Sequence, residues 1–384
     1  MNQKKGNSKG KNSFLNILYN QEKYKEKNNK MDIRKLLSIA KERDASDLHI
    51  TVGVSPVLRI NGNLKKLNFP ELTFEDVHEM IYSIINDEQK SKYKEFHELD
   101  FSFELENVAR FRINIFQTRR GEAAAFRLIP EKIKSLEELN LPKELTYFTK
   151  KSKGFVIVTG PTGSGKTTTL ATLIDIINRE KYNHIITIED PLEFIHAHKN
   201  SVIDQREVGT HTDSFSYALR SALREDPDVI LVGEMRDLET ISMAVTAAET
   251  GHLVFSTLHT NSAAETVERI INVFPPYQQS QIRTQVAESL LGIVAQTLLP
   301  TIDGEGRVPA IELMVATPAI RNIIREEKIH QMPAIIQMGR KDGMISLDQS
   351  LKELLIEGKI SREEAIKKAI DKKVFMQTHR NFKS

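Results

Sequence analysis

At positions 160–167 the sequence reads Gly-Pro-Thr-Gly-Ser-Gly-Lys-Thr, the complete pattern of a phosphate-binding loop. The apolar run Phe155–Val158 before it predicts a buried strand, and residues 168–178 after it repeat leucine and isoleucine at helical spacing. Glycines in such a loop let successive backbone N–H groups point inward, and the positive end of the new helix adds to their attraction for phosphate. This order of strand, loop and helix predicts a nucleoside triphosphate site on an α/β sheet.

Two side chains of the loop are expected to act directly on the bound nucleotide. Lys166 supplies a positive charge for the outer phosphates, and Thr167 supplies a hydroxyl for the Mg²⁺ ion that bridges them. The expected nucleotide-binding residues are Gly160, Pro161, Thr162, Gly163, Ser164, Gly165, Lys166, Thr167 and Thr168.

The composition is that of a globular protein with two to three domains. The chain has 384 residues, 40% of them hydrophobic and 28% charged, and a net charge of +2 that makes no demand for a nucleic-acid partner. The absence of cysteine excludes disulfides and cysteine-based zinc sites. No stretch approaches the ~18 apolar residues of a membrane helix, and the apolar patch at 14–19 is too short for a secretory signal. We expect a cytoplasmic protein.

The chain before the loop divides into a tail and a small domain. Residues 1–30 are polar and lysine-rich, so we expect disorder there. Two interpretations of this tail stay open: a weak surface-binding arm, or a chain whose true start is Met31. Residues 31–141 combine an amphipathic helix, a capping box at Thr73 and several alternating strands, which predicts an α+β domain. Prolines at 130 and 142 bracket the expected hinge.

The second domain is expected to span residues 142–384. Strands and helices alternate from Gly154, a pattern that predicts a parallel sheet covered by helices on both faces. From about residue 300 we expect mostly helices. The predicted core strands are 155–158, 184–188, 229–232 and 253–256.

Two of these strands deliver carboxylates to the edge of the sheet where ligands bind. Glu234 follows the strand 229–232 and is expected to hold Mg²⁺ or to orient the attacking water, the alternative being a solvated loop residue. The strand 184–188 is followed by a denser cluster, which beside bound phosphates would be repulsive without a divalent cation. The cluster comprises Glu189, Asp190 and Glu193.

Histidines and arginines are harder to interpret from spacing. His252 and His259 bracket one predicted strand, and structural and catalytic roles weigh about equally. Their spacing excludes a local zinc site. Arginines crowd two strands of the first domain, where spacing alone favours a solvated basic face over arginine fingers that reach a neighbouring subunit. These arginines are Arg110, Arg112, Arg119, Arg120 and Arg127.

Taken together, the motifs resemble those of the secretion ATPases of type II secretion and type IV pilus machines. Residues Ala319–Glu326 look like the C-terminal signature of the twitching-motility (PilT-type) retraction ATPases, with Ile323 where leucine is usual. Glu327, next to it, stands where glycine is common. The resemblance covers residues 31 to about 370. The other matching motifs are Ser46–His49, Gly160–Thr167, Ile186–Glu193, Val229–Asp237, Gly251–His259 and Asp348–Leu351.

The resemblance implies an α/β fold: a RecA-like P-loop ATPase core, a PAS-like N-terminal domain and a C-terminal helical subdomain, assembled as a ring of six. It implies that Arg112 and Arg127 reach the nucleotide of a neighbouring subunit, which reverses the interpretation from spacing. It also assigns catalysis to Glu193 and Glu234. The remaining roles that it implies are metal binding for Thr167 and Glu234, and phosphate sensing for His252 and His259.

The function implied is that of a hexameric motor that hydrolyses ATP, with Mg²⁺, to retract a type IV pilus. Such a motor works at the cytoplasmic face of the inner membrane on a platform protein, so its membrane association is indirect. One alternative is an assembly or secretion ATPase of the same superfamily, but these usually carry a four-cysteine zinc site. The others are a DNA-linked conjugation-type ATPase, which the near-neutral charge supports little, and a ring that binds ATP only as a switch.

Overall fold

The computed structural model describes residues 31–60, 62–129, 132–304 and 306–376, and the basic tail 1–30 lies outside them. The chain forms two compact units, one ending at Ile129 and one starting at Pro130. This division falls before the boundary that we expected after Leu141. The difference arises because Leu136 and Leu141 are buried in the core of the second unit.

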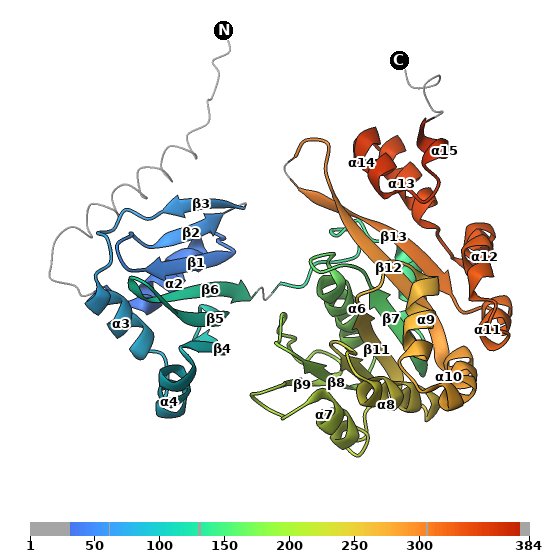
Figure 1. Ribbon diagram of the computed structural model, residues 1–384, viewed down its shortest axis with the longest axis horizontal. Coiled ribbons are helices and arrows are strands. Elements are labelled where there is room, and N and C mark those ends of the chain that lie inside the picture. The colour runs from blue at the N-terminus through green and yellow to red at the C-terminus, as the bar shows by residue number, and fades with distance from the viewer. Residues whose placement is uncertain (1–30, 61, 130–131, 305, 377–384) are drawn as a thin grey trace, which may run out of the picture. The chain divides into compact units, whose positions relative to one another are not determined.

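The first unit is an antiparallel six-stranded sheet with helices, in the order β3-β2-β1-β6-β5-β4 (Figure 1). Its strands are β1 (Asp47–Thr51), β2 (Val57–Ile60), β3 (Asn63–Lys66), β4 (Glu98–Leu105), β5 (Ala109–Thr118) and β6 (Gly121–Ile129). Its helices are α2 (Ile33–Glu42), α3 (Phe74–Tyr82) and α4 (Asp87–Phe96). The amphipathic helix and the alternating strands predicted for this region are therefore present.

Local sequence explains how this unit is built. Thr73 caps α3 as predicted, since its side chain accepts from the Asp76 backbone and the Asp76 carboxylate accepts from the Thr73 backbone. Along β5, Phe111 and Ile113 alternate into the core, which places Arg112 on the opposite face of the sheet.

The second unit is a seven-stranded sheet in the order β13-β12-β7-β11-β10-β8-β9. All neighbouring strands are parallel except β12 and β13, which form an antiparallel pair at one edge. Its strands are β7 (Gly154–Thr159), β8 (His184–Glu189), β9 (Val202–Glu207), β10 (Val229–Val232), β11 (Leu253–Leu258), β12 (Leu290–Pro300) and β13 (Arg307–Val315).

Helices cover this sheet and continue beyond it. They are α5 (Thr146–Thr149), α6 (Lys166–Glu180), α7 (Phe215–Ala222), α8 (Leu238–Glu249), α9 (Ala263–Asn272), α10 (Pro276–Ser289), α11 (Pro318–Arg325), α12 (Met332–Met338), α13 (Leu347–Ile356), α14 (Arg362–Lys368) and α15 (Lys372–Met376). Short 3₁₀ turns lie at Lys143–Leu145, Ile329–Gln331 and Gly339–Asp342. No helix among the described residues is both long and apolar enough to cross a membrane.

The central strand β7 is apolar on both faces because each face meets a separate core. Phe155 and Ile157 pack into the core that contains α7, α8, α9 and α10. Val156 and Val158 pack into the core that contains α6. The continuous apolar run in the sequence therefore reports a strand buried on both sides, as predicted.

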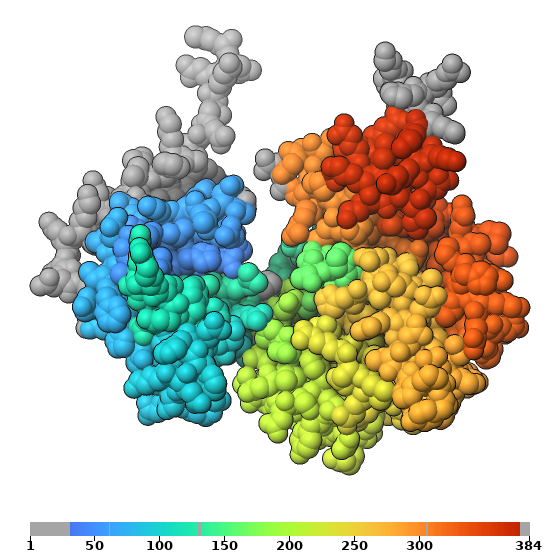
Figure 2. Space-filling view, in the orientation of Figure 1, coloured from blue at the N-terminus to red at the C-terminus, as the bar shows by residue number. Residues whose placement is uncertain are grey.

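The edges of this sheet were not predicted. After Pro300 we expected mostly helices, but β13 comes first and helices resume only at Pro318. β12 also escaped prediction because α10 ends at Ser289 and the strand starts at the next residue, without a glycine or proline loop between them. The C-terminal helices α13–α15 then pack on Leu299 and Val308 of this strand pair, and Figure 2 shows them as the red body beside orange residues.

Candidate nucleotide site

The loop at 160–167 lies between β7 and α6, at the carboxyl end of the central strand. Gly160, Gly163 and Gly165 have φ values of 144°, 76° and 88°, a region that L side chains rarely adopt. Gly165 caps α6 without a side chain, which leaves the first N–H groups of the helix facing the loop. The predicted strand, loop and helix are thus confirmed, and they form an anion-binding turn.

Lys166 is buried and its ammonium group lies inside the loop. Its Nζ donates to the carbonyls of Gly160 at 2.8 Å and Pro161 at 3.2 Å. Burial lowers the pKa of Lys166, and the charges of Glu234 and Glu193 act in the opposite direction. The lysine charge is therefore held by carbonyl oxygens in the loop and is available to phosphate oxygens there.

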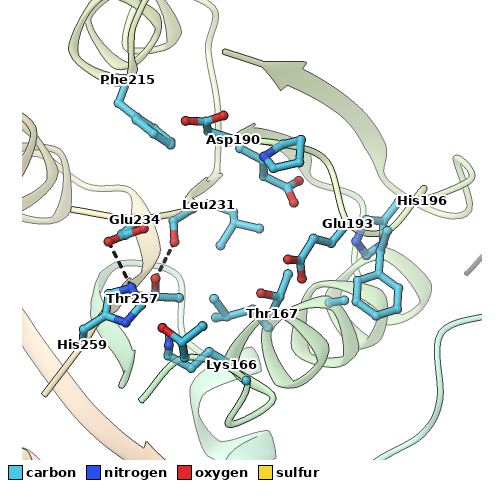
Figure 3. A pocket seen from close by; sticks show the side chains of 18 residues that line it. Lys166, Thr167, Asp190, Glu193, His196, Phe215, Leu231, Glu234, Thr257 and His259 are labelled. Carbon is cyan, nitrogen blue, oxygen red and sulfur yellow. Dashed lines mark hydrogen bonds and ion pairs between the residues drawn. The ribbon is translucent and has the colours of Figure 1, made fainter. Parts of the chain in front are cut away.

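A cavity of about 180 Å³ opens beside the loop, where the carboxyl ends of β8, β10 and β11 meet (Figure 3). Loop and helix residues form one wall, and the acidic residues after β8 and β10 form the other. Side chains that line it include Lys166, Thr167, Glu189, Asp190, Glu193, His196, Phe215, Glu234, Thr257 and His259. Of the residues predicted to act on phosphate, Lys166, Thr167, Glu193, Glu234 and His259 are thus brought together.

Glu234 is held by a histidine and an arginine. His259 Nε2 lies 3.0 Å from its Oε1, and Arg236 donates to its Oε2 at 2.8 Å. Burial acts to raise the pKa of Glu234, but the Arg236 hydrogen bond and the charges of His259 and Lys166 outweigh it, so the pKa is lowered. Glu234 is therefore ionised at neutral pH, and its carboxylate faces the cavity (Figure 3).

Oxygen donors converge in the same cavity. Thr167, Glu193 and Glu234 all line it, and Figure 3 shows Glu193 and Thr167 approaching one another across it. Among the described residues no group of three or more histidines or carboxylates could hold a metal ion by itself. This donor set fits Mg²⁺, which usually takes one or two protein oxygens and completes its shell with waters and substrate phosphates.

Glu189 is a carboxyl group of the cavity to which we gave no role of its own. It is buried, and burial raises its pKa to about 7, although hydrogen bonds from Thr187 at 2.8 Å and Gln205 at 3.4 Å act in the opposite direction. The sequence already indicated the hydrogen bond between Thr187 and Glu189, since residues two apart on a strand lie on the same face of the sheet.

Gln296 of β12 supports the loop and was missed. Its Oε1 accepts from Thr169 Oγ1 and its Nε2 donates to the Ser164 carbonyl, both at 2.7 Å. Both bonds are buried. A single amide within the apolar run Leu290–Leu299 was the available signal, because a buried polar side chain requires partners.

The two predicted histidines lie at opposite ends of β11. His259 follows the strand and contacts Glu234, whereas His252 precedes it, roughly 20 Å away by strand geometry. The ring of His252 bonds instead to the Ala247 carbonyl at 2.9 Å, at the end of α8. The length of the strand therefore separates His252 from the cavity of its own chain, and a phosphate-sensing role for His252 stays a prediction.

Arg112 and Arg127 belong to the first unit, where they lie directly opposite one another on β5 and β6. Arg127 Nε donates to Asp47 Oδ1 at 3.0 Å, and Asp47 also faces Arg59 at 3.7 Å. The side chain of Arg127 is nevertheless mostly exposed, at 69%. A part for these arginines at a neighbour's nucleotide stays a prediction.

The C-terminal signature has a clear local structure. Arg321 of α11 donates to the carbonyls of Ala316 at 3.1 Å, Glu288 at 2.6 Å and Leu290 at 2.8 Å, and also to that of Ala287. The carbonyls of Ala287, Glu288 and Leu290 lie at the C-terminal end of α10, where a helix leaves carbonyls without helical partners. Arg321 therefore fastens α11 to the junction between α10 and β12.

Comparisons with known proteins agree with this geometry. The family model described as "Type II/IV secretion system protein" matches residues 22–367. A type IV pilus retraction ATPase, PilT, of Pseudomonas aeruginosa is 53% identical over 339 residues, which cover 88% of this chain and 98% of the relative. A twitching motility protein of Neisseria gonorrhoeae is 53% identical over 315 residues, 82% of this chain and 84% of the relative.

Among solved structures, the crystal structure of the pilus retraction motor PilT with bound ADP matches with a TM-score of 0.84 and 48% identity. The match covers 90% of this chain and 98% of that one. Fold and loop thus define a RecA-like P-loop ATPase with an N-terminal strand domain. The chain belongs to the type II/IV secretion ATPase family and, within it, is a PilT-type ATPase.

Proposed function

We propose that this chain is the hexameric motor that retracts a type IV pilus at the expense of ATP. The observation that carries the proposal is the 53% identity to a retraction ATPase over 98% of that relative's length. Retraction rather than another task of the superfamily is also favoured by the C-terminal signature Ala319–Glu326.

The proposed chemistry is in-line attack of water on the γ-phosphoryl group. Loop N–H groups and Lys166 offset the charge that develops on the phosphate oxygens. Glu234 is ionised, and the contacts with His259 and Arg236 fix its carboxylate toward the cavity, where it orients the attacking water. Glu193 contributes a second carboxylate from the same wall of the cavity, across from the loop.

Mg²⁺ is the proposed cofactor beside ATP. Thr167 and Glu234 would hold it, and the ion would supply positive charge that offsets the charge of the phosphates. The protein positions these oxygens by the start of α6 and the end of β10.

Arg112 and Arg127 are proposed to complete the site of a neighbouring subunit in the ring. The pair lies on a sheet face that the helices leave free, and a mostly exposed guanidinium suits a ligand that another chain supplies. Asp47 holds Arg127 in one orientation until a phosphate competes for it.

The motor would act from the cytoplasmic face of the inner membrane on the platform protein of the pilus machine. The membrane association is indirect, and no nucleic acid is expected as partner because the net charge is only +2.

The proposal is tested by two variants and their mixture. Lys166→Ala and Arg127→Ala should each abolish ATP turnover, and cells that carry either should keep surface pili but lose retraction of fluorescently labelled pili. Mixed rings should regain part of the turnover, because some sites then combine an intact Lys166 with an intact Arg127 from the neighbour. Arg119→Ala, in the turn after β5, is the matched control with unchanged turnover. Normal retraction with Lys166→Ala would refute the motor, and mixed rings without activity would refute the shared site.

A further inference from the structure

A buried amide outside the loop is built into the phosphate site. Gln296 lies on β12, 132 positions after Ser164, yet it donates to the carbonyl of that loop residue at 2.7 Å. Its oxygen accepts from Thr169 in the first turn of α6 at 2.7 Å. Both ends of the amide are thus used, and the rotamer of Gln296 is fixed by two anchors on either side of Lys166.

The bond to Ser164 determines where the next N–H group points. In a planar trans peptide the C=O and the following N–H point in opposite directions. Because Nε2 of Gln296 draws the Ser164 carbonyl toward β12, the N–H of Gly165 is turned away from β12, toward the inside of the loop. Donors on that side are the ones that a phosphate chain requires.

Two glycines of the loop fit against the same residue. A Cβ at Gly160 would lie 2.1 Å from the Gln296 carbonyl oxygen, and a Cβ at Gly165 would lie 2.8 Å from its Nε2. The loop backbone is therefore packed on Gln296 as closely as a backbone can be.

We infer that Gln296 is a positioning residue for the bound nucleotide: it holds the Ser164–Gly165 peptide so that the Gly165 N–H faces the phosphates. The inference rests on the proposed nucleotide site at 160–168. Gln296 itself touches no phosphate, and its effect passes through the loop backbone.

The first test compares Gln296→Leu with the native chain in binding ADP and pyrophosphate. We expect both affinities to fall by about tenfold or more, since a charge-assisted backbone bond is lost in each case. The melting temperature without ligand should fall, because the Ser164 carbonyl and the Thr169 hydroxyl each lose a buried partner, and binding is therefore measured at a temperature at which the variant is folded. Thr169→Val, which removes one anchor of the amide, should weaken binding in the same direction but less. Thr297→Val, the next residue on the opposite face of β12, is the control and should bind as the native chain does.

The second test uses Gln296→Glu and its pH dependence. A carboxylate cannot donate to the Ser164 carbonyl, whereas a protonated carboxyl can. The ratio of the variant's dissociation constant to that of the native chain should therefore decrease as the pH is lowered through the titration of Glu at 296. Thr297→Glu, which places a carboxylate one residue further along β12, measures how much of this decrease arises from charge repulsion of the phosphates. A purely structural part for Gln296 would give both variants the same pH dependence.

The outcomes separate this inference from the proposed site. If the native chain fails to bind ADP, the site at 160–168 is wrong. If the native chain binds and Gln296→Leu binds equally well, the positioning part of Gln296 is refuted. Should Gln296→Leu not fold, the comparison of Gln296→Glu with Thr297→Glu decides: a larger decrease for Gln296→Glu supports the inference, and an equal decrease or a constant ratio overturns it.

Discussion

Replacement of Gly160 by alanine tests how tightly the loop is packed on β12. The added Cβ would lie 2.1 Å from the Gln296 carbonyl oxygen and 2.7 Å from Ser164 Oγ, below any real contact of a Cβ atom. The nearest atom belongs to the backbone of a strand held on both sides by β7 and β13, so it cannot turn aside. Either the loop or the strand has to move.

Two costs add in this variant. A φ of 144° at a residue with a side chain costs about 1–3 kcal/mol. Insertion of a methyl group into a space already filled costs a further ~1–3 kcal/mol. Gly160→Ala should therefore lower the free energy of unfolding by about 2–6 kcal/mol, and it should weaken ADP binding because the displaced loop loses its N–H geometry.

Gly163→Ala is the matched control. Its φ of 76° is also left-handed, but nothing lies within 4 Å of its added Cβ. Only the backbone term of about 1–2 kcal/mol should apply. Urea unfolding of both variants without ligand, followed at equal protein concentration, measures the difference. Equal losses of unfolding free energy for Gly160→Ala and Gly163→Ala would show that the contact with β12 adds no cost, and would refute the reasoning.

Two further predictions concern a buried carboxyl group and the C-terminal signature. Burial raises the pKa of Glu189 from 4.5 to about 7, so this group destabilises the fold increasingly as the pH rises through that window. The free energy of unfolding of Glu189→Gln, relative to that of the native chain, should therefore rise by up to about 3 kcal/mol between pH 5 and pH 8. The same difference in urea midpoint between variant and native chain at both pH values would contradict this. Arg321→Lys keeps the charge but cannot bond four carbonyls, so it should lose about 2 kcal/mol of unfolding free energy, with Arg321→Met losing more. Chemical denaturation measures the unfolding free energy of both Arg321 variants. A value for Arg321→Met equal to that of the native chain would show that Arg321 does not hold α11 in place.

The elements that the sequence predicted well are those in which local pattern and tertiary packing agree. The run Phe155–Val158 became β7, and the leucines and isoleucines after the loop became the buried side of α6. Helix α13 is one of the helices expected after residue 300, and both of its ends have a local signal: Ser346 forms a capping box with Gln349, and Gly358 follows in a left-handed conformation.

The elements that escaped prediction lack such a local signal. β9 lies at the edge of the sheet and reads Val-Ile-Asp-Gln-Arg-Glu, with little apolar alternation. β12 follows a helix directly, and its pairing with β7 depends on residues more than a hundred positions away. Sequence spacing likewise did not show that His252 lies at the end of β11 far from the phosphate loop, so structural and catalytic roles weighed about equally there. Which end of a strand faces the ligand is a property of the sheet, not of the motif.

The close fit between β12 and the loop has a consequence for protein engineering. The loop Gly-Pro-Thr-Gly-Ser-Gly-Lys-Thr cannot bind phosphate in an arbitrary scaffold. Two of its glycines are required because the neighbouring strand β12 approaches them too closely for a side chain. Transfer of the loop into another α/β scaffold would need a host strand that places a backbone carbonyl and a side-chain carboxamide at the same positions relative to the loop. Without such a strand, the grafted loop would keep its sequence but not its conformation.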